Sequence, residues 1–262
     1  MNAATPSAAR AQSPRAALLL ALLSLCAFAR PARAELEVLG FSADGKHAVL
    51  LEHGVAEGSG YPWARATVLE VAKNTVVGKP VEVTLESGDA TEQEAVAKAK
   101  KAFEETRGKL GVAALKAAKL IAHDEKGNLK DREGAPIGTL KLTSRKAKGK
   151  EAARPCDEPF AAYLVTLRMF WMDDDTPAKL LADKKVPKER ACTQGCKLGR
   201  VFADGRSAVF ELECAVQGYE GPATKSVAVS ARLAYGLDED LPGSDATPEK
   251  DTPAGAPAAK PE

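Results

Sequence analysis

The sequence predicts an α+β fold that is mainly antiparallel β, either sandwich-like or built from two packed β-meanders, with an inserted helical segment near residues 91–123. Asp44-Gly45 and Asp204-Gly205 each stand between apolar runs, a strong hairpin signal because the turn requires positive φ angles. Several short segments alternate apolar and polar residues, as half-buried strands do. The region between the two hairpins has helical composition and a helix-start signal.

The N-terminal segment, residues 1–34, has the pattern of an export signal. A basic flank precedes the apolar run from Ala16 to Ala29, and Ala32-Arg33-Ala34 satisfies the small-x-small cleavage rule. The run, about 14 residues long, is too short to span a bilayer, which takes about 20. We expect cleavage near Ala34, no transmembrane segment, and a soluble protein in the periplasm or outside the cell. A lipid anchor at Cys26 is disfavoured because Leu25 stands where a small residue is required.

Charge and length exclude some functions. Cleavage removes four arginines and leaves 33 basic against 36 acidic residues, a net charge of about −3. A chain with this slight acidic excess lacks the basic charge that nucleic-acid-binding proteins carry, so we expect no nucleic acid as a partner. The remaining 228 residues suit one domain or two small ones.

The mature chain holds four cysteines, an even number that suits disulfides in an oxidising compartment. Four cysteines allow three pairings, and the spacing by itself does not choose among them. A hairpin at Asp204-Gly205 would bring Cys196 and Cys214 face to face, which favours the bridges Cys196–Cys214 and Cys156–Cys192. A zinc site is the rival interpretation, but Cys-x3-Cys without a nearby His is a poor match to known spacings.

The predicted elements follow in chain order. The first group of strands spans Leu36–Leu39, Ala48–His53, Ala66–Val71 and Val81–Leu85, with a glycine-rich loop at Gly54–Trp63. Thr91 and Glu94 form a capping box before a helix whose inner face carries Val96, Ala99 and Phe103. The alanine content of 112–123 predicts a second helix, followed by a polar loop over 124–136.

Further strands are expected after the helical segment. They span 137–142, 161–171, 198–201, 207–214 and 226–233, with 180–182 either a short strand or a turn of helix. From Leu237 the chain is Pro, Ala, Asp and Glu with almost nothing to bury, so 237–262 is predicted to be a disordered tail.

An internal echo links the two hairpins. Aligning Asp44 with Asp204 without a gap matches Gly58 to Gly218 and Pro62 to Pro222, and pairs Arg65 with Lys225. One interpretation is chance recurrence of Asp-Gly turns. The other is two duplicated β units, about 36–90 and 196–235, around a helical insert within a single β-rich domain over 35–236.

Signals for catalysis and metal binding are weak. The three histidines, His47, His53 and His123, fall in no metal-ligand spacing, and we expect no metal or cofactor. Asp173–Asp175 could hold calcium, but a solvated turn is the favoured interpretation because the Gly and distal Glu of an EF-hand are missing. The basic run from Arg145 to Lys150 fits an exposed loop better than a surface for anionic lipid or polymer.

One resemblance rests on the first hairpin and its loop. Leu39-Gly-Phe-Ser-Ala-Asp-Gly-Lys, then Glu52, Gly54-Val55 and Gly58-Ser-Gly-Tyr-Pro62, resemble the predicted secreted bacterial proteins of domain of unknown function 2259. The resemblance implies export and assigns no activity.

Two functions are weighed on these residues. The favoured one is a non-enzymatic binding or structural domain whose contact surface for a protein or envelope ligand is Gly58, Ser59, Gly60, Tyr61 and Trp63, with a counterpart at Gly218–Pro222. The alternative is a hydrolase acting in the cell envelope through a carboxylate pair, Glu52 with Asp44 or with one of Asp173–Asp175. The alternative for the loop is a purely structural role, in which its glycines allow the backbone to make a compact turn.

Overall fold

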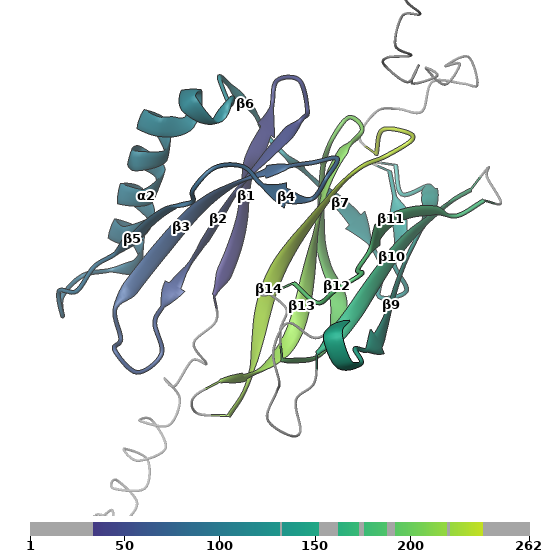
Figure 1. The fold of residues 1–262 in the computed structure, drawn as a ribbon. Helices are drawn as coiled ribbons and strands as arrows, with labels where there is room; N and C mark the ends of the chain where they lie inside the picture. The colour runs from purple at the N-terminus through teal and green to yellow at the C-terminus, as the bar shows by residue number, and fades with distance from the viewer. Residues whose placement is uncertain are drawn as a thin grey trace, which may run out of the picture.

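A computed structural model of the chain describes residues 34–131, 133–151, 162–172, 176–187, 192–218 and 221–237. Two antiparallel sheets and one α-helix make up the fold within these ranges (Figure 1). The predicted class, mainly antiparallel β with a helical insert, is confirmed. The predicted export signal and most of the predicted tail lie outside the described residues.

The first sheet has six strands in the order β4-β3-β2-β1-β6, with β5 pairing β3 beside β4. Its strands are β1 (Glu35–Ser42), β2 (His47–Val55), β3 (Pro62–Glu70), β4 (Thr75–Val76), β5 (Val81–Thr84) and β6 (Leu115–Lys116). The first three form a meander, which we call the first meander.

The second sheet has eight strands in the order β11-β10-β9-β8-β7-β12-β13-β14. Its strands are β7 (Lys119–His123), β8 (Asn128–Lys130), β9 (Pro136–Lys146), β10 (Tyr163–Trp171), β11 (Ala178–Ala182), β12 (Thr193–Asp204), β13 (Ser207–Gly218) and β14 (Gly221–Arg232). The last three form the second meander. A short 3₁₀ turn, η3 (Gly149–Glu151), follows β9.

The helix α2 (Glu92–Thr106) lies on the outer face of the first sheet, and the 3₁₀ turn η2 (Arg107–Leu110) extends it (Figure 1). Its predicted capping box is present: Glu94 N–H donates to Thr91 Oγ1 at 3.3 Å, and Thr91 N–H donates to Glu94 Oε2 at 2.8 Å. Ala99 and Phe103 are buried as predicted. The small side chains of Ala95 and Ala99 let the helix pack closely on the sheet.

The first meander lies between α2 and the second meander. Because successive side chains of a strand point to opposite faces, Val49 and Leu51 of β2 pack under α2, whereas Ala48 and Leu50 pack toward the second sheet. The second sheet then curls, so that β9 and β10 cover the far face of the second meander (Figure 1).

The Asp-Gly turns of the two meanders touch. Ser207 Oγ donates a hydrogen bond to the Gly45 carbonyl at 2.6 Å. Gly45 has φ +66°, and a Cβ at this position would lie 2.7 Å from Ser207 Oγ. Glycine is therefore required both by the turn and by the contact.

The predicted second helix is wrong. Residues 112–123 hold two strands instead: β6 pairs with β1 of the first sheet, and β7 pairs with β12 of the second. Ile121 of β7 is buried in the core of the second sheet. Pairing with two edges outweighs the modest helix propensity of alanine. The expected polar loop over 124–136 likewise contains β8, and 180–182 belongs to β11.

The predicted bridge Cys196–Cys214 is formed across β12 and β13, where the two residues are directly opposed. Cys192 is also disulfide-bonded. Its predicted partner, Cys156, lies outside the described residues, so that pairing stays a prediction.

A candidate binding groove between the two meanders

The predicted glycine-aromatic loop is the connection between β2 and β3. Gly60 N–H donates to the Ala56 carbonyl at 3.0 Å, and Ala56 N–H donates to the Tyr61 carbonyl at 2.8 Å. Gly58 and Gly60 have φ angles of +83° and +70°, as the tight loop requires. Gly58, Ser59 and Gly60 are exposed and Tyr61 is half-buried.

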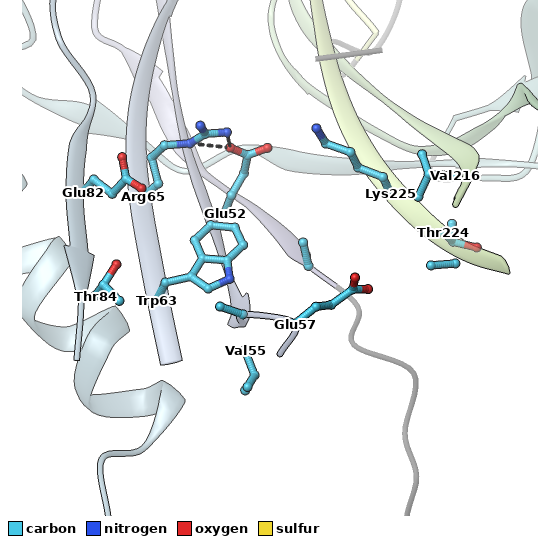
Figure 2. Close-up of a pocket in the computed structure, with 13 residues that line it drawn as sticks. Glu52, Val55, Glu57, Trp63, Arg65, Glu82, Thr84, Val216, Thr224 and Lys225 are labelled. Atoms are coloured by element: carbon cyan, nitrogen blue, oxygen red, sulfur yellow. Dashed lines mark hydrogen bonds and ion pairs between the residues drawn. The ribbon is translucent and has the colours of Figure 1, made fainter. Parts of the chain in front are cut away.

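Beside this loop, a pocket of about 540 Å³ lies between the ends of the two meanders (Figure 2). The first meander and its neighbour β5 contribute Glu52, Val55, Ala56, Glu57, Trp63, Arg65, Glu82 and Thr84; the second contributes Val216, Ala223, Thr224 and Lys225; Ala34 completes the lining. Strand ends 160 residues apart in the sequence thus line one cavity.

A second pocket of about 360 Å³ shares Glu52, Arg65 and Lys225 with the first. It is more apolar, since Leu50, Leu69, Val227 and Val229 line it, and Asn74 and Ala228 also contribute to its wall. We call the two adjoining pockets the groove.

The two basic side chains of the groove, Arg65 and Lys225, differ in whether a carboxylate pairs with them. Arg65 Nε donates to Glu52 Oε2 at 2.9 Å, and Arg65 Nη2 contacts the same oxygen, so that the two opposed residues of β2 and β3 form an ion pair. Lys225 extends from β14 toward Glu52 (Figure 2). Across the described ranges, no hydrogen bond or ion pair engages the Lys225 ammonium.

The structure divides the predicted site residues. Trp63 lies in β3, and its indole lines the groove (Figure 2). Gly58, Ser59, Gly60 and Tyr61 do not line it; they form the exposed loop at its margin. Sequence reasoning missed Glu82 altogether. It paired Arg65 with Lys225 in the internal echo, but nothing local indicated that both side chains reach one cavity.

The predicted counterpart loop at Gly218–Pro222 differs from the first. β13 continues to Gly218 and β14 starts at Gly221, so the two strands are joined much more tightly than β2 and β3. Pro62 opposes Val55, whereas Pro222 opposes Gln217. The ungapped match of the prolines therefore does not carry over to equivalent cross-strand partners.

The carboxylates proposed for hydrolysis are not brought together where the structure describes them. Asp44 lies in the β1–β2 turn, whereas Glu52 is five residues beyond the start of β2, roughly 16 Å along the strand. Hydrogen bonds from the Ser42 hydroxyl (2.7 Å) and the Lys46 N–H (3.1 Å) hold the pKa of Asp44 well below its usual range. Asp173–Asp175 lie outside the described residues.

The described residues contain no group of three or more His, Cys, Asp or Glu side chains placed to hold a metal ion. His53 Nδ1 lies 2.5 Å from Glu92 Oε1, and His123 Nε2 lies 2.5 Å from the Gly199 carbonyl. In the predicted basic segment, Arg145 forms a bidentate ion pair with Glu151 and, with the Lys148 N–H, lowers the pKa of Glu151 to about 2.

Comparison with known proteins adds one family. The predicted secreted proteins of domain of unknown function 2259 match residues 49–232, from within β2 to the end of β14, and the match includes the loop and the groove. None of the curated proteins matches the chain. No helix within the described ranges combines the length and apolar character that a membrane crossing requires. The match covers well over half of the sequence, and the chain belongs to the family of predicted secreted proteins of domain of unknown function 2259.

Proposed function

We propose that this protein is exported and acts as a non-enzymatic binding protein, with the groove between its two meanders as the ligand site. The observation that carries the proposal is the shared lining: Trp63 of the first meander and Lys225 of the second face one cavity. Ligand sites favour concave places where rigid elements meet and where a few polar groups converge.

The side chains of the groove suit reversible binding. Trp63 supplies a large apolar surface with few rotamers to immobilise. The Glu52–Arg65 pair and Glu82 supply hydrogen-bonding groups in fixed positions because they stand on paired strands. The loop at 58–61 lies at the margin of the groove, where exposed loop residues are placed to contact a ligand.

Three features support export. The family is one of predicted secreted proteins, the N-terminus has the pattern of a cleavable signal, and the second meander carries the Cys196–Cys214 disulfide. A ligand outside the cytoplasm, either a protein or another component of the envelope, follows from this location.

The hydrolase alternative is favoured by no observation. Glu52 is engaged by Arg65, and Asp44 is engaged within its own turn. The alternative therefore stays a prediction only for the pairing of Glu52 with one of Asp173–Asp175, which lie outside the described residues.

Tryptophan fluorescence tests the binding proposal directly, because the sequence holds only two tryptophans. In a Trp171→Phe variant, Trp63 is the sole emitter and reports on the groove. Peptide, glycan and lipid fractions of a bacterial envelope are added in turn to the mature protein. We expect at least one fraction to shift the Trp63 emission and to protect it from acrylamide quenching.

Lys225→Ala should weaken the response to that fraction, whereas Lys98→Ala, an exposed change on α2, should leave it unaltered. Equal responses in both variants would place the ligand elsewhere. No protection of Trp63 by any fraction contradicts the proposed function. If Trp63→Ala lowers the melting temperature strongly, Trp63 is a core residue and not a contact residue.

A further inference from the structure

The groove runs along an unpaired sheet edge. β14 is the last strand of the second sheet, with β13 on one side and no strand of the described ranges on the other. It is long, at 12 residues, and pairs with β13 without a register shift. A regular edge of this length presents a row of backbone donors and acceptors to an added strand.

The register identifies which backbone groups face outward. Ser230 N–H does not bond to β13; it donates to Asn74 Oδ1 at 2.8 Å. Because outward and inward groups alternate along an antiparallel strand, Thr224, Ser226 and Ala228 also direct N–H and C=O to the free edge. Pro222, which has no N–H, belongs to the same outward series, as expected for proline in an edge strand.

Asn74 closes one end of this edge, and the groove accompanies the rest. Thr224 and Lys225 line the first pocket, and Lys225, Val227 and Ala228 line the second. The outward backbone groups of 224–228 therefore lie beside the cavities, next to apolar side chains of the first meander such as Leu50 and Leu69.

Charge indicates the chemistry of an added strand. In the first meander Arg65 opposes Glu52 and is neutralised by it. In the second meander Lys225 opposes Cys214, which is held in a disulfide, so the residue directly across the hairpin from Lys225 is not a carboxylate. Two and four residues further along β14, the largely buried Val227 and Val229 lie on the same face as Lys225 and line the second pocket.

We propose that the groove binds an extended acidic-apolar peptide segment of another polypeptide by β-addition to the free edge of β14. The peptide hydrogen-bonds with the backbone of Thr224, Ser226 and Ala228. It places an Asp or Glu beside Lys225, and apolar residues at the next alternate positions beside Val227 and Val229. This inference names the ligand class and rests on the function proposed above.

The probe is a fluorescein-labelled synthetic peptide, Thr-Val-Thr-Val-Thr-Asp-Thr, added to the full mature protein; in an antiparallel register its aspartate lies beside Lys225 and its valines beside Val227 and Val229. Fluorescence anisotropy should show saturable binding. A peptide with lysine in place of the aspartate should bind about tenfold more weakly, in line with the loss of a partly desolvated charge pair. A peptide N-methylated at alternate residues, whose edge donors are blocked, should not bind.

Protein variants separate backbone pairing from charge. Thr224→Pro removes an outward N–H and should abolish binding, whereas Thr224→Ala keeps the donor and should not. Lys225→Glu should reverse the preference, so that the lysine peptide binds better than the aspartate peptide. Lys98→Glu makes the same charge change on α2 and should leave the preference as it is. Circular dichroism and thermal melting confirm that each variant is folded.

Amide hydrogen exchange provides the direct readout. The peptide should slow the exchange of the Thr224 and Ala228 N–H groups. Binding without this protection, or equal binding of the N-methylated peptide, overturns β-addition. If truncation after Leu237 alone speeds exchange at these amides, the edge is occupied by the chain's own acidic tail, and the proposal of an external partner is wrong.

The outcomes also separate this inference from the proposed function. A glycan or lipid fraction that protects Trp63, together with no binding of any probe peptide, overturns the peptide inference and leaves the groove as a binding site. If neither a fraction nor a peptide affects Trp63, both proposals fail.

Discussion

The two meanders of this protein begin from the same local pattern and end in different surroundings. Each is three antiparallel strands with an Asp-Gly turn between the first two, and the two turns are joined by the Ser207–Gly45 hydrogen bond. α2 covers the outer face of the first meander, whereas curled strands of its own sheet cover the second.

The elements that cover each meander account for the different sizes of the side chains on its covered face. Under α2, β3 presents Ala64 and Ala66 to Ala95 and Ala99, because a helix can approach a sheet closely only over small residues. Under β9 and β10, β13 presents Phe210 and Leu212, which fill the wider space inside the curled sheet. A shared hairpin pattern thus leaves the packing partner open.

The charges differ in the same way. The first meander neutralises Arg65 within its own hairpin, and the second uses a disulfide at the position opposite Lys225. The groove therefore has an internally satisfied wall and a wall whose cation is available to a ligand. Whether the two meanders arose by duplication stays a prediction.

Weakening the packing of α2 on the first meander should have the largest effect on stability. Phe103 is 1% exposed beneath α2, and Phe103→Ala should lower the free energy of unfolding by about 4 kcal/mol through lost burial and a cavity. Urea titration monitored by circular dichroism measures the change. Val96→Ala, at a half-buried position of the same helix, is the control and should cost about 1 kcal/mol. Similar small losses in both variants would mean that α2 contributes little to the first meander.

Removing the disulfide of the second meander should have the second-largest effect on stability. The double variant Cys196→Ala/Cys214→Ala frees a loop with a sequence separation of 18 and should destabilise the protein by about 3 kcal/mol. The same urea titration applies. Peptide mapping without reduction checks the remaining cysteines, where a free thiol at Cys156 or Cys192 refutes the second predicted bridge.

The contact between the meanders should depend on pH through Glu211. Burial alone raises its pKa, but hydrogen bonds from Arg200 and Ser226 and the Arg200 charge outweigh burial and bring the pKa below the ordinary 4.5. Arg200 Nε donates to Glu211 Oε2 at 2.6 Å, and Arg200 Nη2 donates to the Leu36 carbonyl of β1 at 2.5 Å.

Because the folded-state pKa is lowered, this contribution is complete above pH 4.5 and is lost as pH falls through the folded-state value. Glu211→Gln should cost about 2 kcal/mol at pH 7 and less in acid. Thermal melts of both proteins from pH 7 to 3 test this: the gap between them should narrow as pH falls. A constant gap would show that the carboxylate charge does not stabilise the contact.

The smallest effect is expected where the Asp-Gly turns meet. Ser207→Ala removes the bond to the Gly45 carbonyl and should cost about 1 kcal/mol. Ser87→Ala is the matched control, since that hydroxyl bonds the exposed Asp89 and its loss should be close to neutral. An equal effect of the two changes in thermal melting would show that the turn contact adds nothing to stability.

Local signals predicted most of the elements. Both Asp-Gly hairpins, the Thr91–Glu94 cap and the Cys196–Cys214 bridge are confirmed because each depends on residues close in sequence or symmetric about a turn. The site was predicted only in part. Trp63 lines the groove, but its partners across the cavity come from the other meander.

The sequence by itself determined where the two Asp-Gly turns lie, where the helix starts and that Cys196 faces Cys214, since turn, cap and hairpin energies act over a few residues. Only the tertiary structure decided that 112–123 splits into β6 and β7, because strand pairing with distant edges outweighs alanine's helix propensity. It also decided that Lys225 and the free edge of β14 face Trp63 across one groove, since that juxtaposition depends on the packing of two sheets.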